Sequence, residues 1–359
     1  MKRRSICIVN KHFAPHVGGI ETVVEQHAKA LATAFDVEVA VCADLGDKTE
    51  RYQQENISVR KFKTQFKLLK VPFSLGFFWH ILANKNDIFY LHEPFPFGMM
   101  CLWLLRKRNI VVFYHSDIIK QKRAKQVVVP VQKRLFRRVT KIIAASQNIV
   151  RFSDVLPQFA SKVSVVPFWL ENVPKAARSG SKTSENSPFI FLGRWSTYKG
   201  LGILVDAIKS LPKDIPFQIV GQGDCSHLLD PIRQFENVEI IEGFVSETEK
   251  QTMLFDARAL LFPSISENEA FGIMQLEAMQ LGTPVINTDL KSGVPEIARH
   301  EIEALTVPPG RSSELASAIL RLSRDENLCE RLSRNCIERA KEFDETILSE
   351  KLVAVFAAI

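Results

Sequence analysis

Short apolar runs alternate with amphipathic stretches along most of the chain. In the first half the predicted strands are Ser5–Asn10, Val37–Cys42, Ile57–Phe62, Ile88–His92, Ile110–Tyr114, Ile142–Ala145 and Val163–Val166. Between the first two, apolar residues recur at helical spacing from Ile20 to Leu31, which predicts a helix. Strands that alternate with helices are typical of α/β domains with parallel sheets.

The same alternation returns after a polar, aperiodic segment at residues 173–187, whose composition is typical of a linker. The predicted strands there are Phe189–Leu192, Phe217–Val220, Val238–Ile241, Ala259–Phe262 and Pro284–Asn287. The predicted helices are Leu201–Leu211, His227–Glu236, Glu247–Asp256, Ile273–Leu281 and Ser312–Leu322. We therefore expect Rossmann-like domains at residues 1–172 and 188–340, and a C-terminal helix at 341–359 that crosses back to the first. Ligands of such sheets bind beyond the carboxyl ends of the strands, so two facing edges would form one cleft.

Length and composition agree with this organisation. The 359 residues exceed what one hydrophobic core usually serves. Six scattered cysteines without a C-x-x-C pair indicate reduced thiols and predict neither a disulfide framework nor a zinc site. The first apolar run, Ile6–Val9, is shorter than the roughly 7–15 residues of a secretory signal, and no run approaches the ~20 residues of a membrane-spanning helix. We expect a cytoplasmic protein.

Charge is unevenly divided between the two halves. Residues 1–172 carry 27 Lys+Arg and 13 Asp+Glu, a net +14, whereas residues 173–359 carry 20 and 27, a net −7. One basic stretch, 60–70, precedes the aromatic residues 73–79; the other, 120–141, includes Lys133, Arg134, Arg137 and Arg138. This pattern favours an anionic membrane surface or lipid phosphate over nucleic acid, because no nucleic-acid module is present. For any single residue, however, a solvated helix face is the simpler explanation.

The strongest chemical signal is the segment Pro263–Met279, in which a buried strand leads through a turn into a helix that opens around Phe271. A helix start offers free N–H groups and positive dipole charge to a phosphate. Glu269 and Glu277 are eight residues apart, so a helical rise would separate their backbones by roughly 12 Å. That spacing suits a long ligand with a central diphosphate and hydroxyls at both ends, such as a nucleotide sugar.

This segment resembles the E-x7-E motif of glycosyltransferase family four, the retaining enzymes of the GT-B fold. The resemblance implies that Glu269 and the helix start hold the donor hexose and diphosphate, and that Glu277 binds the ribose. Gly193–Gly200 resembles the family's G-R-x4-K-G segment, so Arg194 and Lys199 would neutralise the leaving nucleoside diphosphate. The glycine turns at 18–19 and 221–223 would lie against the donor. The implied donor-binding set is Gly18, Gly19, Gly193, Arg194, Lys199, Gly221, Gly223, Glu269, Ala270, Phe271, Gly272, Ile273 and Glu277.

Two further segments narrow the resemblance. The sequences H-E-P-F-P at 92–96 and H-S-D-I at 115–118 follow neighbouring strands and are similar to a subgroup of mannosyl- and related transferases that build bacterial surface polysaccharides. By this resemblance the acceptor or sugar side comprises His92, Glu93, His115, Ser116 and Asp117, and His115 joins Glu269, Arg194 and Lys199 as catalytic. His92 is explained equally well as a satisfied histidine at a strand end.

The resemblance implies transfer of a hexose from a nucleoside-diphosphate donor, with GDP-mannose first and a GDP-deoxyhexose such as GDP-rhamnose, or a UDP-sugar, as alternatives. The acceptor would be a polyprenyl-diphosphate-linked saccharide at the inner membrane face, and no metal or other cofactor is expected. A non-catalytic nucleotide-sugar-binding or membrane-surface protein remains an alternative, as does an epimerase or phosphorylase of similar fold. The chain departs from the family pattern at Trp169, in a glycine position, and at 300–305, which lack both glycines of H-G-x-x-G-L.

Overall fold

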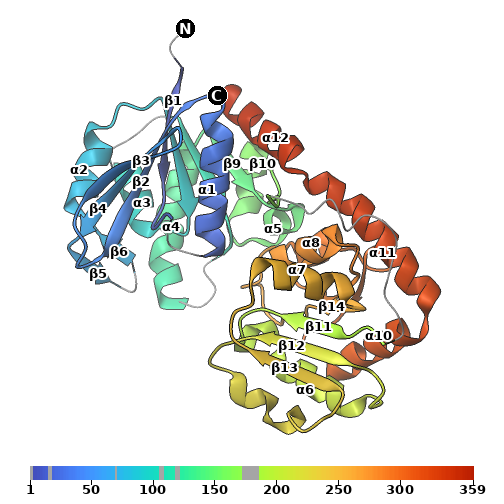
Figure 1. The fold of residues 1–359 in the computed structure, drawn as a ribbon. Coiled ribbons are helices and arrows are strands. Elements are labelled where there is room, and N and C mark those ends of the chain that lie inside the picture. Colours follow the sequence, from blue (N-terminus) through green and yellow to red (C-terminus); the bar gives the residue numbers. More distant parts are fainter. Residues whose placement is uncertain (1–2, 15–17, 69–70, 105–108, 118–121, 172–185) are drawn as a thin grey trace. The chain divides into compact units, whose positions relative to one another are not determined.

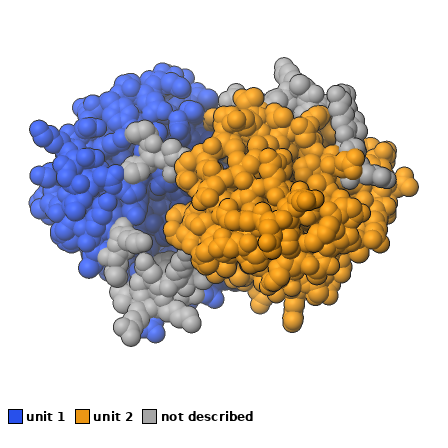
Figure 2. Space-filling model, turned by 60° about the horizontal axis from the view of Figure 1, so that its bottom comes forward, with its two compact units in different colours: residues 1–168, 346–359 blue, residues 169–345 orange. Residues whose placement is uncertain are grey.

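The computed structural model describes residues 3–14, 18–68, 71–104, 109–117, 122–171 and 186–359, except the side chains of 122–125 and 127. The chain forms two compact units (Figures 1 and 2), one of Met1–Phe168 with Thr346–Ile359 and the other of Trp169–Glu345. Most of the predicted linker, 173–187, lies outside the described residues, and the expectation of a cleft between two domains stays a prediction. Among the described residues no helix is both long and apolar enough to cross a membrane.

The first unit is built on an eight-stranded sheet with the order β10-β9-β8-β7-β1-β2-β4-β3. Its strands are β1 Ser5–Val9, β2 Asp36–Leu45, β3 Glu50–Gln54, β4 Ile57–Thr64, β7 Ile88–Glu93, β8 Ile110–Tyr114, β9 Lys141–Ala144 and β10 Val163–Val165. All neighbours pair in parallel except β3 with β4. The order from β4 to β9 is that of a doubly wound fold, in which connections leave in opposite directions from β1 and β7.

Helices and one hairpin complete the first unit. They are α1 Gly19–Ala32, the hairpin β5 Phe66–Leu68 with β6 Val71–Phe73, α2 Leu75–Ala83, α3 Pro96–Leu104, α4 Lys122–Arg138, α5 Gln147–Phe152, the 3-10 helix η1 Leu156–Lys162 and α12 Glu345–Ala357. The last helix packs Phe356 against Tyr90, with ring centroids 4.8 Å apart, and against Phe35 at 6.4 Å. Residues from the end of the chain therefore contribute to the core of the first unit.

The second unit has a six-stranded, all-parallel sheet of order β13-β12-β11-β14-β15-β16. The strands are β11 Phe189–Leu192, β12 Phe217–Gly221, β13 Val238–Glu242, β14 Ala259–Leu261, β15 Val285–Thr288 and β16 Ala304–Val307. The helices are α6 Leu201–Ser210, α7 Glu247–Asp256, α8 Ile273–Gln280, α9 Val294–Ile297, α10 Ser312–Arg324 and α11 Glu326–Ala340, with short 3-10 turns at η3 Thr197–Lys199, η4 Ser226–Ile232 and η5 Lys341–Phe343. Counted along this unit, the order is 3-2-1-4-5-6, so the switch point lies between β11 and β14.

Every strand predicted from the apolar runs is present. The expectation of a helix at His227–Glu236 was wrong, because the chain there forms a 3-10 turn, Ser226–Ile232, that contains Pro231, which has no N–H to donate. Strands β3, β5, β6 and β16 were not predicted. The first three lie at an edge or in a two-stranded hairpin, where the apolar run that marks a buried parallel strand is not required.

Candidate functional site

The switch point of the second sheet brings two predicted site residues together. Lys199 follows β11 and Glu269 follows β14, which are neighbouring parallel strands, and the two side chains form an ion pair. Both are largely shielded from solvent, at 18% and 13% exposure. The Lys199 amine also lies 5.0 Å from the ring centroid of Phe262. A diphosphate bound here would meet Lys199, whose position is already fixed by the Glu269 carboxylate. Arg194, on the same loop, is exposed.

The turn after β12 lies directly against this loop. The N–H of Gly193 donates to the carbonyl of Val220 at 3.0 Å, and the N–H of Trp195 donates to Gln222 at 2.8 Å. Gly221 has a φ of +145°, and a Cβ there would lie 1.9 Å from the Gly193 carbonyl oxygen, so only glycine fits. The predicted glycine turn is thus required by close contact between two backbones.

A cavity of about 800 Å³ opens beyond the carboxyl ends of β11, β12 and β13. It is lined by Gly193 and Arg194, by the turn 221–223, by residues 242–245 and by Glu247 and Lys250 of α7. A volume of this size is in the range of small-molecule sites. Its position agrees with the rule that ligands bind at the strand ends beside the switch point.

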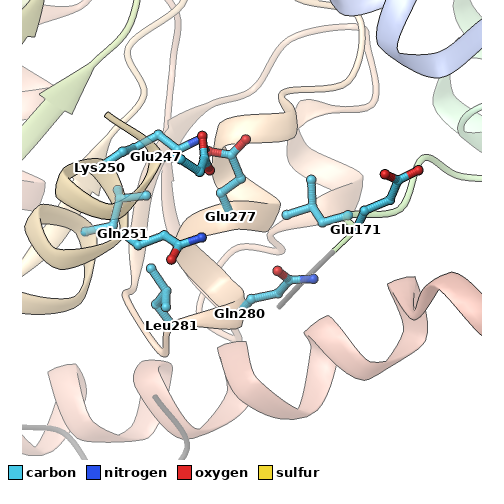
Figure 3. A pocket seen from close by; sticks show the side chains of 9 residues that line it. Glu171, Glu247, Lys250, Gln251, Glu277, Gln280 and Leu281 are labelled. Carbon is cyan, nitrogen blue, oxygen red and sulfur yellow. The ribbon is translucent and has the colours of Figure 1, made fainter. Parts of the chain in front are cut away.

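A smaller cavity of about 60 Å³ adjoins α7 and α8 and contains the second predicted carboxylate, Glu277. Figure 3 shows Glu247, Lys250 and Glu277 converging on one point. The Lys250 amine lies 2.7 Å from a carboxylate oxygen of each glutamate. Burial raises the pKa of Glu277, although the Lys250 ammonium opposes this. Burial alone would lower the pKa of Lys250, but the two carboxylates raise it, so the lysine stays charged.

Lys250 and Glu247 were not predicted as site residues, although both line the two cavities. Their position depends on where α7 begins. Ser246 and Glu249 form a capping box that fixes this start, with Ser246 accepting from the Glu249 N–H at 3.2 Å and Glu249 accepting from the Ser246 N–H at 2.7 Å. The capping pattern was readable in the sequence, but the contact of Lys250 with Glu277 was not.

Helix α8 starts at the predicted residue, Ile273, although the motif suggested that it opens around Phe271. It begins at Ile273, with Gly272 as N-cap at a φ of +85°, and residues 269–272 form a turn. The estimate of about 12 Å between Glu269 and Glu277 assumed a continuous helical rise, so its basis was wrong. Phe271 is buried and its ring contacts Phe343, with centroids 6.3 Å apart, so it anchors the segment before α8 to the core. Ala270 accepts from the Gly293 N–H at 2.7 Å.

A buried polar network joins the first turns of α8 to β15. The Asn287 amide, 0% exposed, donates to Gln275 at 2.8 Å and to the Ala298 carbonyl at 2.9 Å. Thr288, on the same strand, donates to the Ser264 carbonyl at 2.6 Å. Hydrogen bonds in a low-dielectric interior restrain the groups that they join, although Oδ1 of Asn287 has no hydrogen-bond partner among the described residues. The start of α8 is therefore positioned rigidly relative to β15.

In the first unit the predicted polar residues meet at the ends of β7 and β8. His92 is fully buried and its Nδ1 lies 3.1 Å from Nε2 of His115, which is 6% exposed. Burial lowers the pKa of His115 to about 3 and that of His92 well below its usual value. Glu93 is also buried, accepts from the amide of Gln132, and has its pKa raised by burial to about 7. The histidine pair is thus neutral at physiological pH.

The other predicted residues of this unit have different environments. Asp117 accepts hydrogen bonds from the hydroxyls of Tyr114 at 2.5 Å and Ser153 at 3.2 Å, so its carboxylate ties the end of β8 to the end of α5. Ser116 is half-buried beside it. Gly18 is the N-cap of α1 and Gly19 its first residue, directly after the switch strand β1. Residues 15–17 of this predicted loop lie outside the described residues.

The basic residues of α4 are mainly on its surface. Arg134, Arg137 and Arg138 are exposed and Lys133 is half-buried, while Arg138 donates to the Trp103 carbonyl at 2.8 Å. One group in the described part of the chain has the proximity to hold a metal ion, namely Cys7, Glu38 and His80. The Arg60 guanidinium lies 2.7 Å from Glu38, and a cation so placed disfavours a metal there.

Local contacts accommodate the positions at which the chain departs from the family pattern. Glu301 stands in a glycine position and keeps a left-handed φ of +58°. Arg321 and Arg331 contact its carboxylate, and Arg331 also donates to its carbonyl at 2.7 Å. These bonds hold a conformation that a side chain rarely adopts. Trp169, the other departure, is buried at 2% exposure.

Comparison with known proteins adds independent support. Residues 17–168 match the family model "Glycosyltransferase Family 4", and residues 174–341 match "Glycosyl transferases group 1". The chain is 28% identical to O-antigen chain mannosyltransferase C of Escherichia coli over 98% of this chain and 96% of the relative. It is 32% identical to D-rhamnosyltransferase WbpZ of Pseudomonas aeruginosa over 79% and 77%.

Solved structures agree on the fold. Sucrose-phosphate synthase from Thermosynechococcus elongatus superimposes with a TM-score of 0.78 at 20% identity, covering 99% of both chains. The lipopolysaccharide glycosyltransferase WaaG gives a TM-score of 0.67 at 16% identity, covering 98% and 99%. Both matches include both Rossmann-like units. The chain therefore belongs to glycosyltransferase family 4, and it is a GT-B glycosyltransferase whose two parallel-sheet domains serve transfer from a nucleotide-sugar donor.

Proposed function

We propose that this glycosyltransferase is a retaining hexosyltransferase that moves mannose from GDP-mannose to a polyprenyl-diphosphate-linked saccharide in the synthesis of a bacterial surface polysaccharide. The observation that carries the proposal is the pair of half-buried carboxylates, Glu269 and Glu277, each held by a lysine from a neighbouring element. The relatives named for mannosyl and D-rhamnosyl transfer support the choice of sugar class.

In this proposal the nucleoside occupies the cavity beyond β11–β13, and the ribose hydroxyls bind Glu277. The diphosphate meets exposed Arg194, Lys199 and the N–H groups at the start of α8. Glu269 accepts hydrogen bonds from hydroxyls of the hexose. Lys199 is paired with Glu269 before any donor arrives, so the lysine is pre-organised. Its reorientation therefore costs little free energy when charge develops on the phosphate.

The chemistry follows from the charge arrangement. The bond from the anomeric carbon to the diphosphate oxygen breaks, and Arg194 and Lys199 stabilise the charge that collects on the diphosphate. The acceptor hydroxyl attacks from the face that the diphosphate leaves, so configuration is retained. Its proton passes to a diphosphate oxygen. No metal takes part in these steps.

For the first unit we propose a contact of neutral His115 with a substrate sugar, flanked by Ser116 and Asp117. His92 is buried against His115, and Glu93 is buried against Gln132. An uncharged imidazole suits hydrogen bonding to a sugar hydroxyl, because it adds no charge to an oxocarbenium-like centre. The basic side chains Lys133, Arg134, Arg137 and Arg138 would attract the anionic inner face of the cytoplasmic membrane, where the acceptor resides.

The donor assignment is tested by thermal shift with GDP, UDP, dTDP and their sugars, with and without chelator. We expect stabilisation by GDP and GDP-mannose that Glu277→Ala abolishes and that chelator leaves unchanged. A shift with UDP-sugars alone would replace GDP-mannose by a UDP-sugar in the donor assignment, and a shift with GDP-rhamnose alone would replace it by that sugar nucleotide. No shift with any nucleotide would favour a non-catalytic protein of this fold, and loss of the shift in chelator would contradict metal independence.

A further inference from the structure

Five large apolar side chains are exposed within a short stretch of the first unit, on the β5–β6 hairpin and α2. They are Phe66 at 55%, Leu68 at 59%, Leu75 at 66%, Trp79 at 61% and Leu82 at 41% exposure. They account for five of the twelve large hydrophobic residues exposed in the described part of the chain, although they fall within 17 positions. Scattered exposed apolar residues are ordinary, but a concentration of them marks an interaction surface.

Helix α2 is apolar on both of its faces. Phe77 and Ile81, four residues apart, are fully buried, and the Phe77 ring contacts those of Phe62 and Phe95 at 6.0 and 5.7 Å. A surface helix normally places polar residues on its outer face. Here the outer positions are instead Leu75, Trp79 and Leu82, which helical spacing brings onto one side.

The hairpin is tied to α2, so both belong to one surface. Gln65, which precedes the hairpin, accepts from the Leu75 N–H at 2.8 Å. Ser74, which follows it, caps the helix by accepting from the Phe77 N–H at 3.2 Å and donates to the Lys63 carbonyl at 2.8 Å. Phe66 and Leu68 lie two apart on β5 and share a face, and Phe66 stacks on Phe73 with centroids 4.9 Å apart.

The charge around this surface identifies its partner. Residues 60–85 contain six Lys or Arg and no Asp or Glu. Lys63 is exposed, whereas Lys67 is paired with Asp44 at 3.0 Å and Arg60 with Glu38 at 2.7 Å. A second copy of this chain bound through the same surface would bring like charges together, which is unfavourable. Basic residues that flank Trp, Phe and Leu instead match the interface of an anionic bilayer, where apolar side chains enter and cations meet lipid phosphates.

We propose that Phe66, Leu68, Leu75, Trp79 and Leu82 form a membrane-insertion face that enters the headgroup region of an anionic bilayer. This face is distinct from the basic surface of α4, because none of the large exposed apolar side chains in the described part of the chain lies on that helix. It makes binding depend on apolar insertion as well as on charge, and it is independent of the donor chemistry proposed above.

The test is co-sedimentation of the full chain with vesicles of phosphatidylglycerol and phosphatidylethanolamine, beside vesicles of phosphatidylcholine. We expect binding to the anionic vesicles and a loss of about tenfold or more in affinity for the double variant L75S/W79S. Both side chains are mainly exposed, so the variant should fold and keep its thermal shift with nucleotide. Trp79→Phe should keep binding, and Ile302→Gln, which removes a residue 41% exposed on the second unit, should change nothing.

Brominated lipids give a second readout, because they quench a tryptophan only at close range. We expect wild-type fluorescence to be quenched and that quenching to disappear in Trp79→Phe. Equal vesicle binding by wild type and L75S/W79S would overturn the proposal. So would a dimer in lipid-free solution that the double variant dissociates, because the face would then be a contact between copies. A failure of nucleotide binding alone would affect only the proposed transfer reaction.

Discussion

Gly200, at the end of the loop after β11, packs directly against the loop after β14. Its φ is +75°, and a Cβ placed there would lie 1.9 Å from the carbonyl oxygen of Pro263. A carbon–oxygen contact needs about 3.3 Å, so one backbone would have to move by more than an ångström. The left-handed conformation costs an alanine roughly 1–2 kcal/mol, and overpacking adds about 1–3 kcal/mol. Gly200→Ala should therefore lower the free energy of unfolding by about 2–5 kcal/mol.

The same substitution should weaken nucleotide binding. Lys199 directly precedes Gly200, and Pro263 begins the loop that carries Glu269, so a displacement of either loop separates the Lys199–Glu269 ion pair. Urea unfolding followed by the fluorescence of buried Trp195 measures the first effect, and titration with nucleotide sugar measures the second.

Gly202→Ala provides the matched control for Gly200→Ala. Gly202 lies inside α6, and the nearest atom to an added Cβ is 3.8 Å away, on Leu228. Alanine is favoured over glycine in a helix by up to about 1 kcal/mol, so this variant should be as stable as wild type or more so. If Gly200→Ala unfolded like the control and bound nucleotide normally, the close approach of the two loops would be refuted.

Three further predictions concern titration, the second ion pair and the histidine pair. Burial raises the pKa of Glu93 from 4.5 to about 7, so the protonated carboxyl stabilises the fold fully below about pH 4.5, and this contribution is lost as the pH rises to about 7. The free energy of unfolding of wild type should therefore fall by about 3 kcal/mol over that window relative to Glu93→Gln. Parallel pH profiles of the two proteins in denaturant unfolding would contradict this. Lys250→Met deprives Glu247 and the half-buried Glu277 of their lysine and should cost about 2 kcal/mol in the same assay, against about 0.5 kcal/mol or less for the exposed pair broken by Lys209→Met. Equal costs would argue against a special role of the Lys250 pair. His92→Phe removes the 3.1 Å contact to His115 and should lower kcat about tenfold with donor Kd unchanged, whereas an unaltered kcat would show that the pair is structural only.

Local sequence determined the strands and the placement of the motifs. A parallel strand covered on both faces must be apolar throughout, so runs such as Phe189–Leu192 and Ala259–Phe262 identify it without any knowledge of its neighbours. Alternation of these runs with helices then predicts the doubly wound order, and that order puts the residues after β11 and β14 beside each other. The fold class was therefore predictable, and so was the proximity of the loops that carry Lys199 and Glu269.

Local sequence failed where long-range contacts replace a local rule. The chain lacks the family's glycine at 301, yet Glu301 has a left-handed φ of +58°, because two arginines of α10 and α11 hold it. His92 and Glu93 were expected on the acceptor or sugar side, but His92 is buried against His115 and Glu93 against Gln132, so their direct contact with a ligand stays a prediction.

The sequence by itself determined which residues end which strands, because hydrophobic burial and turn chemistry act over a few residues. The tertiary structure alone decided which charges meet. Lys199 and Glu269 are 70 positions apart, and Lys250 reaches Glu277 only because the capped start of α7 packs beside α8. The tertiary structure also decided which apolar side chains are exposed. Phe77 and Trp79 are equally apolar in sequence, but packing against Phe62 and Phe95 buries the first and leaves the second at the surface.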